Sequence, residues 1–138
     1  MKACKGFTLI EIMLVVGIIS VLTGAAIFLM SGNVDVAREQ RVLTDLQSIS
    51  TQVKLYEIQN YAPPTTNQGL DALVRKPSSP PVPARWKQLM KSVPLDPWGT
   101  PYQFRYPGTR NPSGFDLFSW GPDRTESEDD IGNWETSQ

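Results

Sequence analysis

Apolar residues fill one continuous segment near the start of the chain. Residues 12–30 have the sequence IMLVVGIISVLTGAAIFLM, in which only Ser20 and Thr23 are polar. No charged residue occurs between Glu11 and Asp35. At ~1.5 Å per residue, a helix over this segment spans roughly 28 Å, about the thickness of the hydrocarbon core of a bilayer. The pattern predicts a single transmembrane helix.

A cleaved secretory signal peptide is the alternative explanation of this segment. The apolar run exceeds the ~7–15 residues of a signal-peptide core, and no A-x-A-like cleavage site follows it. Both points favour an anchor that stays attached to the chain. Lys2 and Lys5 precede the anchor. The positive-inside rule then places the N-terminus in the cytoplasm and the C-terminal domain on the opposite side of the membrane.

The next apolar residues are spaced for one face of a helix. Five of them follow one another at steps of four and three residues: Val42, Leu46, Ile49, Val53 and Tyr56. The first proline is Pro63, so one helix is predicted from about residue 7 to residue 60, with a membrane half at 7–30 and an amphipathic half at 35–60. A coiled coil would need a longer run of heptads. We therefore expect this face to pack against a small sheet.

Residues 31–138 are predicted to form the soluble domain, which begins with the amphipathic half of the helix. A loop region follows at 61–101, with one or two helical turns within 67–76 and a proline-rich connector at 77–85. The connector could resemble a polyproline ligand, but a surface loop is the preferred interpretation. Gly99 lies in a turn where we expect a positive φ angle.

Alternation of apolar and polar residues predicts the strands. Residues 102–106 and 115–120 both alternate, and a third short strand is expected near 131–134. The predicted fold class is α+β: a long N-terminal helix, membrane anchor plus amphipathic half, packed on a small antiparallel β-sheet.

Composition narrows the function classes. The chain has 138 residues and a formal net charge of −1, which suits one modest domain and lacks the basic surface of a nucleic-acid binder. It has no histidine, and Cys4 is its single cysteine. These counts exclude the usual general base, Ser-His and Cys-His catalytic pairs and an intrachain disulfide. Only carboxylates could catalyse, and they crowd in one loop, so we expect a structural protein and no enzyme.

Glu11 interrupts the apolar run, because Phe7, Leu9 and Ile10 precede it. A carboxylate inside an apolar membrane helix costs roughly 2.5–3.5 kcal/mol near the bilayer centre and less near its edge. An acid in such a position is by default a functional residue with a specific partner.

The residues around Glu11 carry a family resemblance. Lys5–Glu11, with the sequence KGFTLIE, resembles the class III leader of type IV pilins and pseudopilins. The resemblance implies that a prepilin peptidase cuts between Gly6 and Phe7 and methylates the new terminal amine of Phe7. Residues 1–6 would be the leader, and its removal would take Cys4 with it. Glu11 would then pair with the terminal amine of a neighbouring subunit, which sets the register of assembly.

Three blocks of the soluble half are similar to the major pseudopilins of type II secretion, within the type IV pilin-like superfamily. They are YAPPTTNQGLDALVRKP at 61–77, LDPWGTPY at 95–102, and FSWGPD with DDIGNW between 118 and 134. The resemblance implies a single-pass inner-membrane subunit with a periplasmic domain. Such a subunit polymerises into a helical pseudopilus that exports folded proteins across the outer membrane. Its partners would be further copies of the chain, the prepilin peptidase, the inner-membrane secretion platform and minor pseudopilins. A pilin of a type IV pilus for adhesion, motility or DNA uptake is the alternative.

The loop at 123–130, DRTESEDD, has five acids and one arginine. Such a loop can be a merely solvated acidic surface, and it lacks the EF-hand spacing. The resemblance implies instead a calcium site with Asp123, Asp129 and Asp130 as ligands, completed by backbone carbonyls near Trp120 and Ser127. The loop departs from the family form because Arg124, Thr125 and Ser127 replace its usual glycines.

Overall fold

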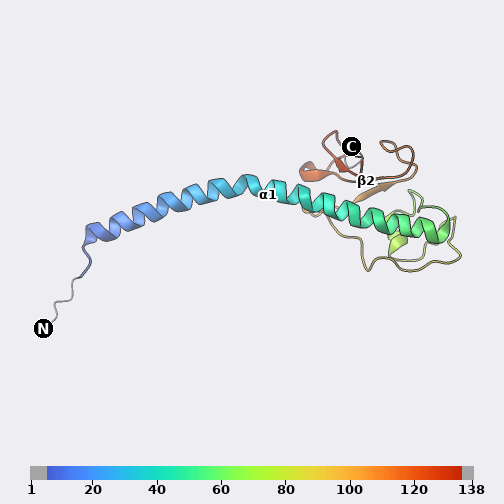
Figure 1. The fold of residues 1–138 in the computed structure, drawn as a ribbon, viewed down its shortest axis with the longest axis horizontal. Coiled ribbons are helices and arrows are strands. Elements are labelled where there is room, and N and C mark those ends of the chain that lie inside the picture. Colours follow the sequence, from blue (N-terminus) through green and yellow to red (C-terminus); the bar gives the residue numbers. More distant parts are fainter. Residues whose placement is uncertain (1–5, 135–138) are drawn as a thin grey trace. The chain divides into compact units, whose positions relative to one another are not determined.

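The computed structural model of the chain describes residues 6–134, and within them the side chains outside residues 27–33. The chain divides into two compact units, Met1–Ala37 and Arg38–Gln138. The helix α1, Leu9–Asn60, contributes to both (Figure 1). Its continuity agrees with the absence of proline before Pro63.

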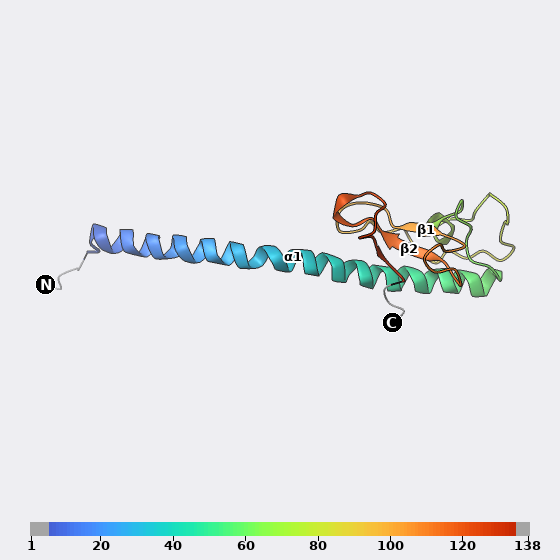
Figure 2. The same cartoon turned by 90° about the horizontal axis from the view of Figure 1, so that it is seen from above.

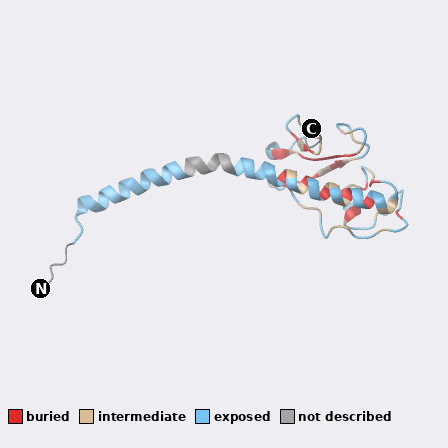
Figure 3. Ribbon diagram, viewed as in Figure 1, coloured by how far each residue is buried: buried red, intermediate tan, exposed pale blue. Residues whose placement is uncertain are grey.

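In the first unit, the described residues of the apolar helix form no core of their own. Every described side chain from residue 6 to residue 26 is exposed (Figure 3). Leu9–Ala26 is long and apolar enough to cross a membrane, by length and composition. The predicted transmembrane helix thus has its counterpart in the structure, whereas the predicted leader residues 1–5 lie outside the described part of the chain.

The second unit has one hydrophobic core between α1 and a small sheet (Figure 2). The five apolar residues predicted to share one face of the helix are all buried there: Val42, Leu46, Ile49, Val53 and Tyr56. The sheet contributes Phe104 and Leu117, and the loops contribute Leu70 and Leu73. The preferred interpretation of the helix face is confirmed, because it packs within its own domain.

The sheet is antiparallel with strand order β1-β2-β3. Its strands are β1 Gln103–Arg105, β2 Asp116–Ser119 and β3 Ile131–Gly132. All three predicted strands exist, although each is shorter than predicted. Asn133 extends the pairing beyond β3: its N–H donates to the Leu117 carbonyl at 2.9 Å, and its Oδ1 accepts from the Leu117 N–H at 3.1 Å.

The predicted alternation of 115–120 is wrong in one respect, because all four residues of β2 are buried. β2 is the central strand, and both of its faces are covered. Leu117 faces the core. On the other face Phe118 lies 5.5 Å from the ring of Trp134 and 5.7 Å from the guanidinium of Arg105. An alternating sequence is therefore no guarantee of a solvated face when a later segment folds over it.

The loops between α1 and β1 are fixed by a few hydrogen bonds. The 3-10 helix η1, Leu70–Leu73, supplies the predicted helical turn. The buried side chain of Gln68 donates through Nε2 to the carbonyls of Ser79 and Pro81, at 2.8 and 3.1 Å, which fastens the proline-rich connector. Gly99 has φ of 84°, as its turn predicts.

Candidate functional site

The predicted cleavage site lies just before α1. Gly6, Phe7 and Thr8 belong to no helix or strand, and the Phe7 side chain is 80% exposed. A peptide bond in such a segment can enter a protease active site without the unfolding of a helix. Cys4 and the rest of residues 1–5 lie outside the described chain.

Glu11 is engaged at the start of its own helix. The Thr8 N–H and Thr8 Oγ1 both lie 3.3 Å from Glu11 Oε2, and the Glu11 N–H donates to Thr8 Oγ1 at 3.3 Å. This reciprocal arrangement is a capping box, which satisfies backbone donors that a helix start otherwise leaves unpaired. The Thr-x-x-Glu spacing was a readable signal for the cap, and our sequence analysis missed it.

The acidic loop lies in the segment that joins β2 to β3. The 3-10 helix η2, Gly121–Asp123, directly follows Trp120 and leads into this loop. Asp123 accepts from the Thr125 N–H at 3.2 Å and from Thr125 Oγ1 at 2.9 Å. These hydrogen bonds lower the pKa of the Asp123 carboxyl, the backbone bond most strongly. Arg124 takes a left-handed conformation with φ of 59°.

Ser127 contacts each of the three predicted ligand carboxylates. Its hydroxyl is 3.4 Å from Asp123 Oδ2 and also contacts Asp129 Oδ1, while its N–H lies 3.3 Å from Asp130 Oδ1. A serine hydroxyl has one proton, so it can donate to only one of the two carboxylates at a time. The loop therefore brings three negative groups around one small polar residue.

Asp130 is the buried member of this group, with 2% of its surface exposed. Burial raises the pKa of its carboxyl, and the nearby charges of Glu126 and Asp123 act in the same direction, against the Ser127 N–H and Arg110. A buried carboxylate with so few donors suits a cation.

The donor set fits calcium in kind, because Ca²⁺ takes carboxylate and carbonyl oxygens. The geometry fits only in part: among the described residues, no three acidic side chains gather closely enough to hold one ion. Binding would require the loop to tighten, with the Ser127 hydroxyl releasing the carboxylates it contacts. The indole Nε1 of Trp120 is buried without a hydrogen-bond partner in the described chain, and as a donor group it could not ligate calcium.

Two arginines outside the loop contact it, and sequence analysis did not single them out. Arg105 of β1 pairs with Glu126 at 3.1 Å. Arg110 donates through Nη2 to the Ser127 carbonyl at 3.1 Å, and its guanidinium lies 4.6 Å from the centre of the Trp134 ring. No local sequence signal predicts these contacts, because they join segments separated by 17 or more residues.

Two buried aspartates organise the loops that flank the acidic loop. Asp116 accepts from the backbone N–H groups of Thr109, Arg110 and Asn111 at 2.6, 3.0 and 2.8 Å. Asp96 accepts from Trp98 and Thr100 N–H at 3.0 and 2.7 Å, and from Ser119 Oγ at 2.6 Å. Their role is positional: Asp116 shapes the loop that precedes β2, and Asp96 joins its own turn to Ser119 at the end of β2.

One hollow lies within the second unit. It has a volume of about 600 Å³ and lies beside α1 and the loop that precedes β2. Its charged lining residues are Lys54 and Glu57, accompanied by neutral polar side chains.

Comparisons with known proteins cover both units. A family model described as "Type II secretion system (T2SS), protein G" matches residues 29–134, and one described as "Prokaryotic N-terminal methylation motif" matches residues 1–27. The type II secretion system core protein G of Pseudomonas aeruginosa is 42% identical over 137 residues, which cover 95% of each chain. The protein of the same name from Escherichia coli K12 is 39% identical over 97% of this chain and 93% of its own.

A solved structure is similar as well. The major pseudopilin from the type 2 secretion system of enterohaemorrhagic Escherichia coli superposes with a TM-score of 0.72 at 42% sequence identity. The match covers 78% of this chain and 91% of the other. It supports the predicted pilin-like α+β fold.

Proposed function

The chain belongs to the type II secretion system protein G family, and on this premise we propose that it is the structural subunit of a periplasmic pseudopilus. The subunit polymerises from the inner membrane and drives export of folded proteins across the outer membrane. One observation carries this conclusion: relatives named core protein G match the chain from its methylation motif to its last strand. The alternative, a pilin for adhesion, motility or DNA uptake, would share the leader but not the match over 29–134.

Processing is the first step of the proposed role. A prepilin peptidase cuts between Gly6 and Phe7 and methylates the amine of Phe7. The exposure of Phe7 and its place ahead of α1 support this site. The chain then remains a single-pass inner-membrane protein with a cytoplasmic N-terminus and a periplasmic domain, as Lys2 and Lys5 before the apolar segment indicate.

Glu11 is the residue through which we expect neighbouring subunits to associate in the filament. Its carboxylate caps α1 through Thr8 in the single subunit. In the filament it meets the terminal amine of a neighbour, whose charge would otherwise be stranded in an apolar environment. Further copies, minor pseudopilins and the inner-membrane platform are the partners.

Calcium bound by the acidic loop is the third element. Asp123, Asp129 and Asp130 would supply carboxylates, and Ser127 and Trp120 would supply backbone carbonyls. The shared contacts of the three carboxylates with Ser127 and the burial of Asp130 support the assignment. Bound calcium would supply positive charge that offsets the mutual repulsion of these carboxylates.

The test of the role replaces the core protein G of a bacterium that secretes by the type II pathway. We expect this chain to restore filaments visible by electron microscopy and the release of folded exoproteins. Restoration of surface adhesion or twitching without exoprotein release would favour the pilin alternative.

The calcium test measures melting of the full chain in detergent micelles. A ligand that binds only the folded state stabilises it by about 2.7 kcal/mol at a hundredfold excess over its dissociation constant. We expect a higher melting temperature in millimolar calcium than in chelator, and loss of this difference in Asp123→Asn and Asp130→Asn. Glu128→Gln is the matched control, because it removes an equal charge from the same loop. Equal melting of the unaltered chain in calcium and in chelator would contradict the site.

A further inference from the structure

The acidic loop already has a cationic partner within the chain. The loop places five acids and one arginine within 123–130, and Arg110 reaches it from the loop between β1 and β2. The Arg110 Nη2 donates to the Ser127 carbonyl at 3.1 Å. This carbonyl belongs to the residue that contacts all three predicted ligand carboxylates.

The backbone of Arg110 is held in place by the buried carboxylate of Asp116. Asp116, 1% exposed, accepts hydrogen bonds from the N–H of Arg110 and from both neighbouring residues. Gly108 is required for this loop, because a Cβ there would collide with the Asn111 carbonyl and with Asp116. The backbone of Arg110 is therefore tied to Asp116 at the start of the central strand β2.

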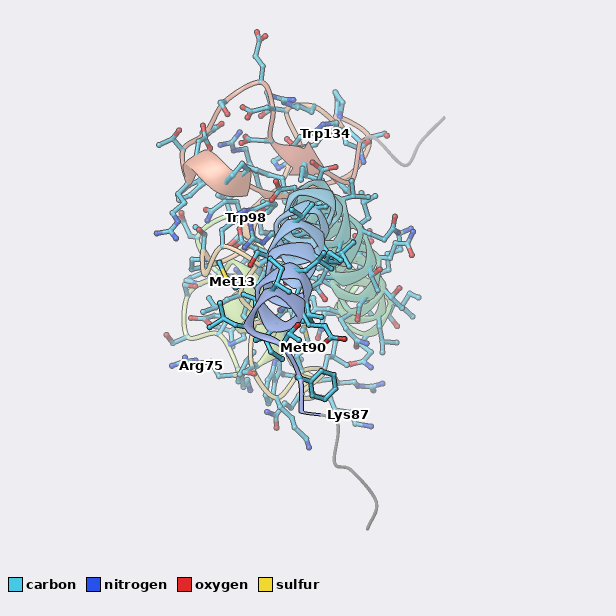
Figure 4. The ribbon with its side chains drawn as sticks, turned by 90° about the vertical axis from the view of Figure 1, so that its left-hand side faces the viewer. Met13, Arg75, Lys87, Met90, Trp98 and Trp134 are labelled. Atoms are coloured by element: carbon cyan, nitrogen blue, oxygen red, sulfur yellow. The ribbon has the colours of Figure 1, made fainter. Side chains whose placement is uncertain are left out.

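The side chain of Arg110 is fixed by an aromatic ring. Its guanidinium lies 4.6 Å from the centre of the Trp134 ring, within the range of a cation–π interaction. Trp134 is itself held, because its ring packs over Gly132 and lies 5.5 Å from Phe118. Trp134 lies at the sheet side of the domain, whereas Arg75 and Lys87 lie on its opposite side (Figure 4). Those two cations are thus remote from the acidic loop.

We propose that Arg110 is a positioning residue that holds the acidic loop closed without a metal ion. The guanidinium donates to the Ser127 carbonyl and brings positive charge to the residue that contacts all three carboxylates. A charge-assisted hydrogen bond of this kind is shorter and stronger than a neutral one. Calcium in the loop would then share or displace Arg110 at this carbonyl, so that the arginine and the metal serve the same purpose. The metal half of this inference rests on the proposed function, whereas the arginine half stands on the contacts.

The consequence is a loop whose closure depends weakly on metal. With Arg110 in place, removal of calcium leaves the Ser127 carbonyl paired. Without Arg110, calcium becomes the main source of positive charge for the loop. The dependence on calcium should therefore be larger in a variant that lacks the guanidinium than in the unaltered chain.

The experiment measures amide hydrogen exchange of the full chain in detergent micelles, in chelator and in millimolar calcium. In chelator, we expect Arg110→Gln to speed exchange of the segment around Ser127 by roughly tenfold or more. Calcium should slow it again, and the ratio of the two rates should exceed that of the unaltered chain. Arg110→Lys keeps the charge and should restore part of the protection.

Arg124→Gln is the matched control, because it removes the same charge from within the loop, and its side chain makes no ion pair in the described chain. We expect it to leave exchange around Ser127 close to that of the unaltered chain. Amides of α1 around Ile49 serve as the internal reference for folding, since this part of the core is remote from Arg110 in sequence and is fully packed. Global unfolding would speed both segments, and loop opening would speed only one.

Two results overturn the arginine clamp. One is unchanged exchange around Ser127 in Arg110→Gln in chelator, and the other is an equal effect of Arg124→Gln. A third result separates the inference from the proposed function. If calcium slows exchange in none of the variants while Arg110→Gln still opens the loop, the clamp is supported and the calcium site is wrong.

Discussion

The two ends of α1 use apolar residues in opposite ways. From Leu9 to Ala26 nearly every residue is apolar and every side chain is exposed. Between Val42 and Tyr56, five apolar residues recur at every third or fourth position and are buried, whereas Leu55, which lies off this spacing, is exposed. The first pattern needs an apolar environment from outside the chain, a bilayer or neighbouring helices. The second finds its partner in the same domain. Under the proposed function, the first half of α1 is therefore the assembling half, and the second half is the folding half.

The largest expected effect breaks the assembling half alone. Glu11→Gln keeps a side chain that can complete the Thr8 capping box, but it removes the charge. We expect filament yield to fall by roughly tenfold or more, because the neighbour's terminal amine loses its partner. The measurement is filament mass in sheared fractions of cells that make the variant.

The folding half should not respond to this change. Melting of the domain in Glu11→Gln is expected to match the unaltered chain. Glu11→Ala removes the cap as well as the charge, and a defect confined to Glu11→Ala would assign the effect to the cap. Normal filaments from Glu11→Gln would discard the charge pairing.

The next effect breaks the folding half. Leu46→Ala removes a buried side chain from the core, and such truncations cost about 2–5 kcal/mol of unfolding free energy. Leu14→Ala makes the same chemical change at an exposed position of the first unit. We expect a large drop in the melting temperature of the domain for Leu46→Ala and none for Leu14→Ala, as measured by circular dichroism in micelles. Equal losses would mean that the two halves do not fold separately.

The smallest expected effect concerns the hydrogen bond between α1 and Tyr102, the residue just before β1. The Tyr102 hydroxyl donates to Asp45 Oδ2 of α1 at 2.8 Å. Burial raises the pKa of Tyr102 above its ordinary value of about 10, and the hydrogen bond and charge of Asp45 raise it further. Because the folded state keeps a proton that the unfolded state loses, the free energy of unfolding should fall as the pH rises above about 10.

Tyr102→Phe tests this link. It should cost about 0.5–1.5 kcal/mol near neutral pH, the usual net contribution of one hydrogen bond. It should also flatten the decline of stability at alkaline pH, as followed by urea unfolding at several pH values. An unchanged slope in Tyr102→Phe would assign the alkaline decline to other groups.

The spacing of apolar residues and the positions of proline and glycine predicted most of the fold. The spacing of apolar residues between Val42 and Tyr56 predicted which helix face is buried. The absence of proline before Pro63 predicted one helix over about residues 7–60, and α1 runs over Leu9–Asn60. The start itself is set by the Thr8 cap. The double burial of β2 was not predictable, because Trp134 and Arg105 cover Phe118 from segments distant in sequence.

The candidate site was predictable to a different extent. Family resemblance pointed to the carboxylates of the acidic loop, and the structure places three of them around Ser127. The family resemblance gave no indication of Arg110, since a cation–π contact depends on where two loops meet in space. Asp96 and Asp116 were also missed as buried acids, because only the folded backbone directs its N–H groups at them.

The proline-rich connector offers a practical handle on the filament. Gln68 fastens it through the carbonyls of Ser79 and Pro81, while the side chain of the adjacent Ser78 is exposed. Removal of the leader would take away the single thiol of the chain, Cys4. A cysteine placed at Ser78 would then be the sole attachment point for a fluorophore or a spin label in the processed subunit. Growth and rotation of the pseudopilus could thus be followed optically, subunit by subunit, from a position held by the domain and remote in sequence from Glu11 and the acidic loop.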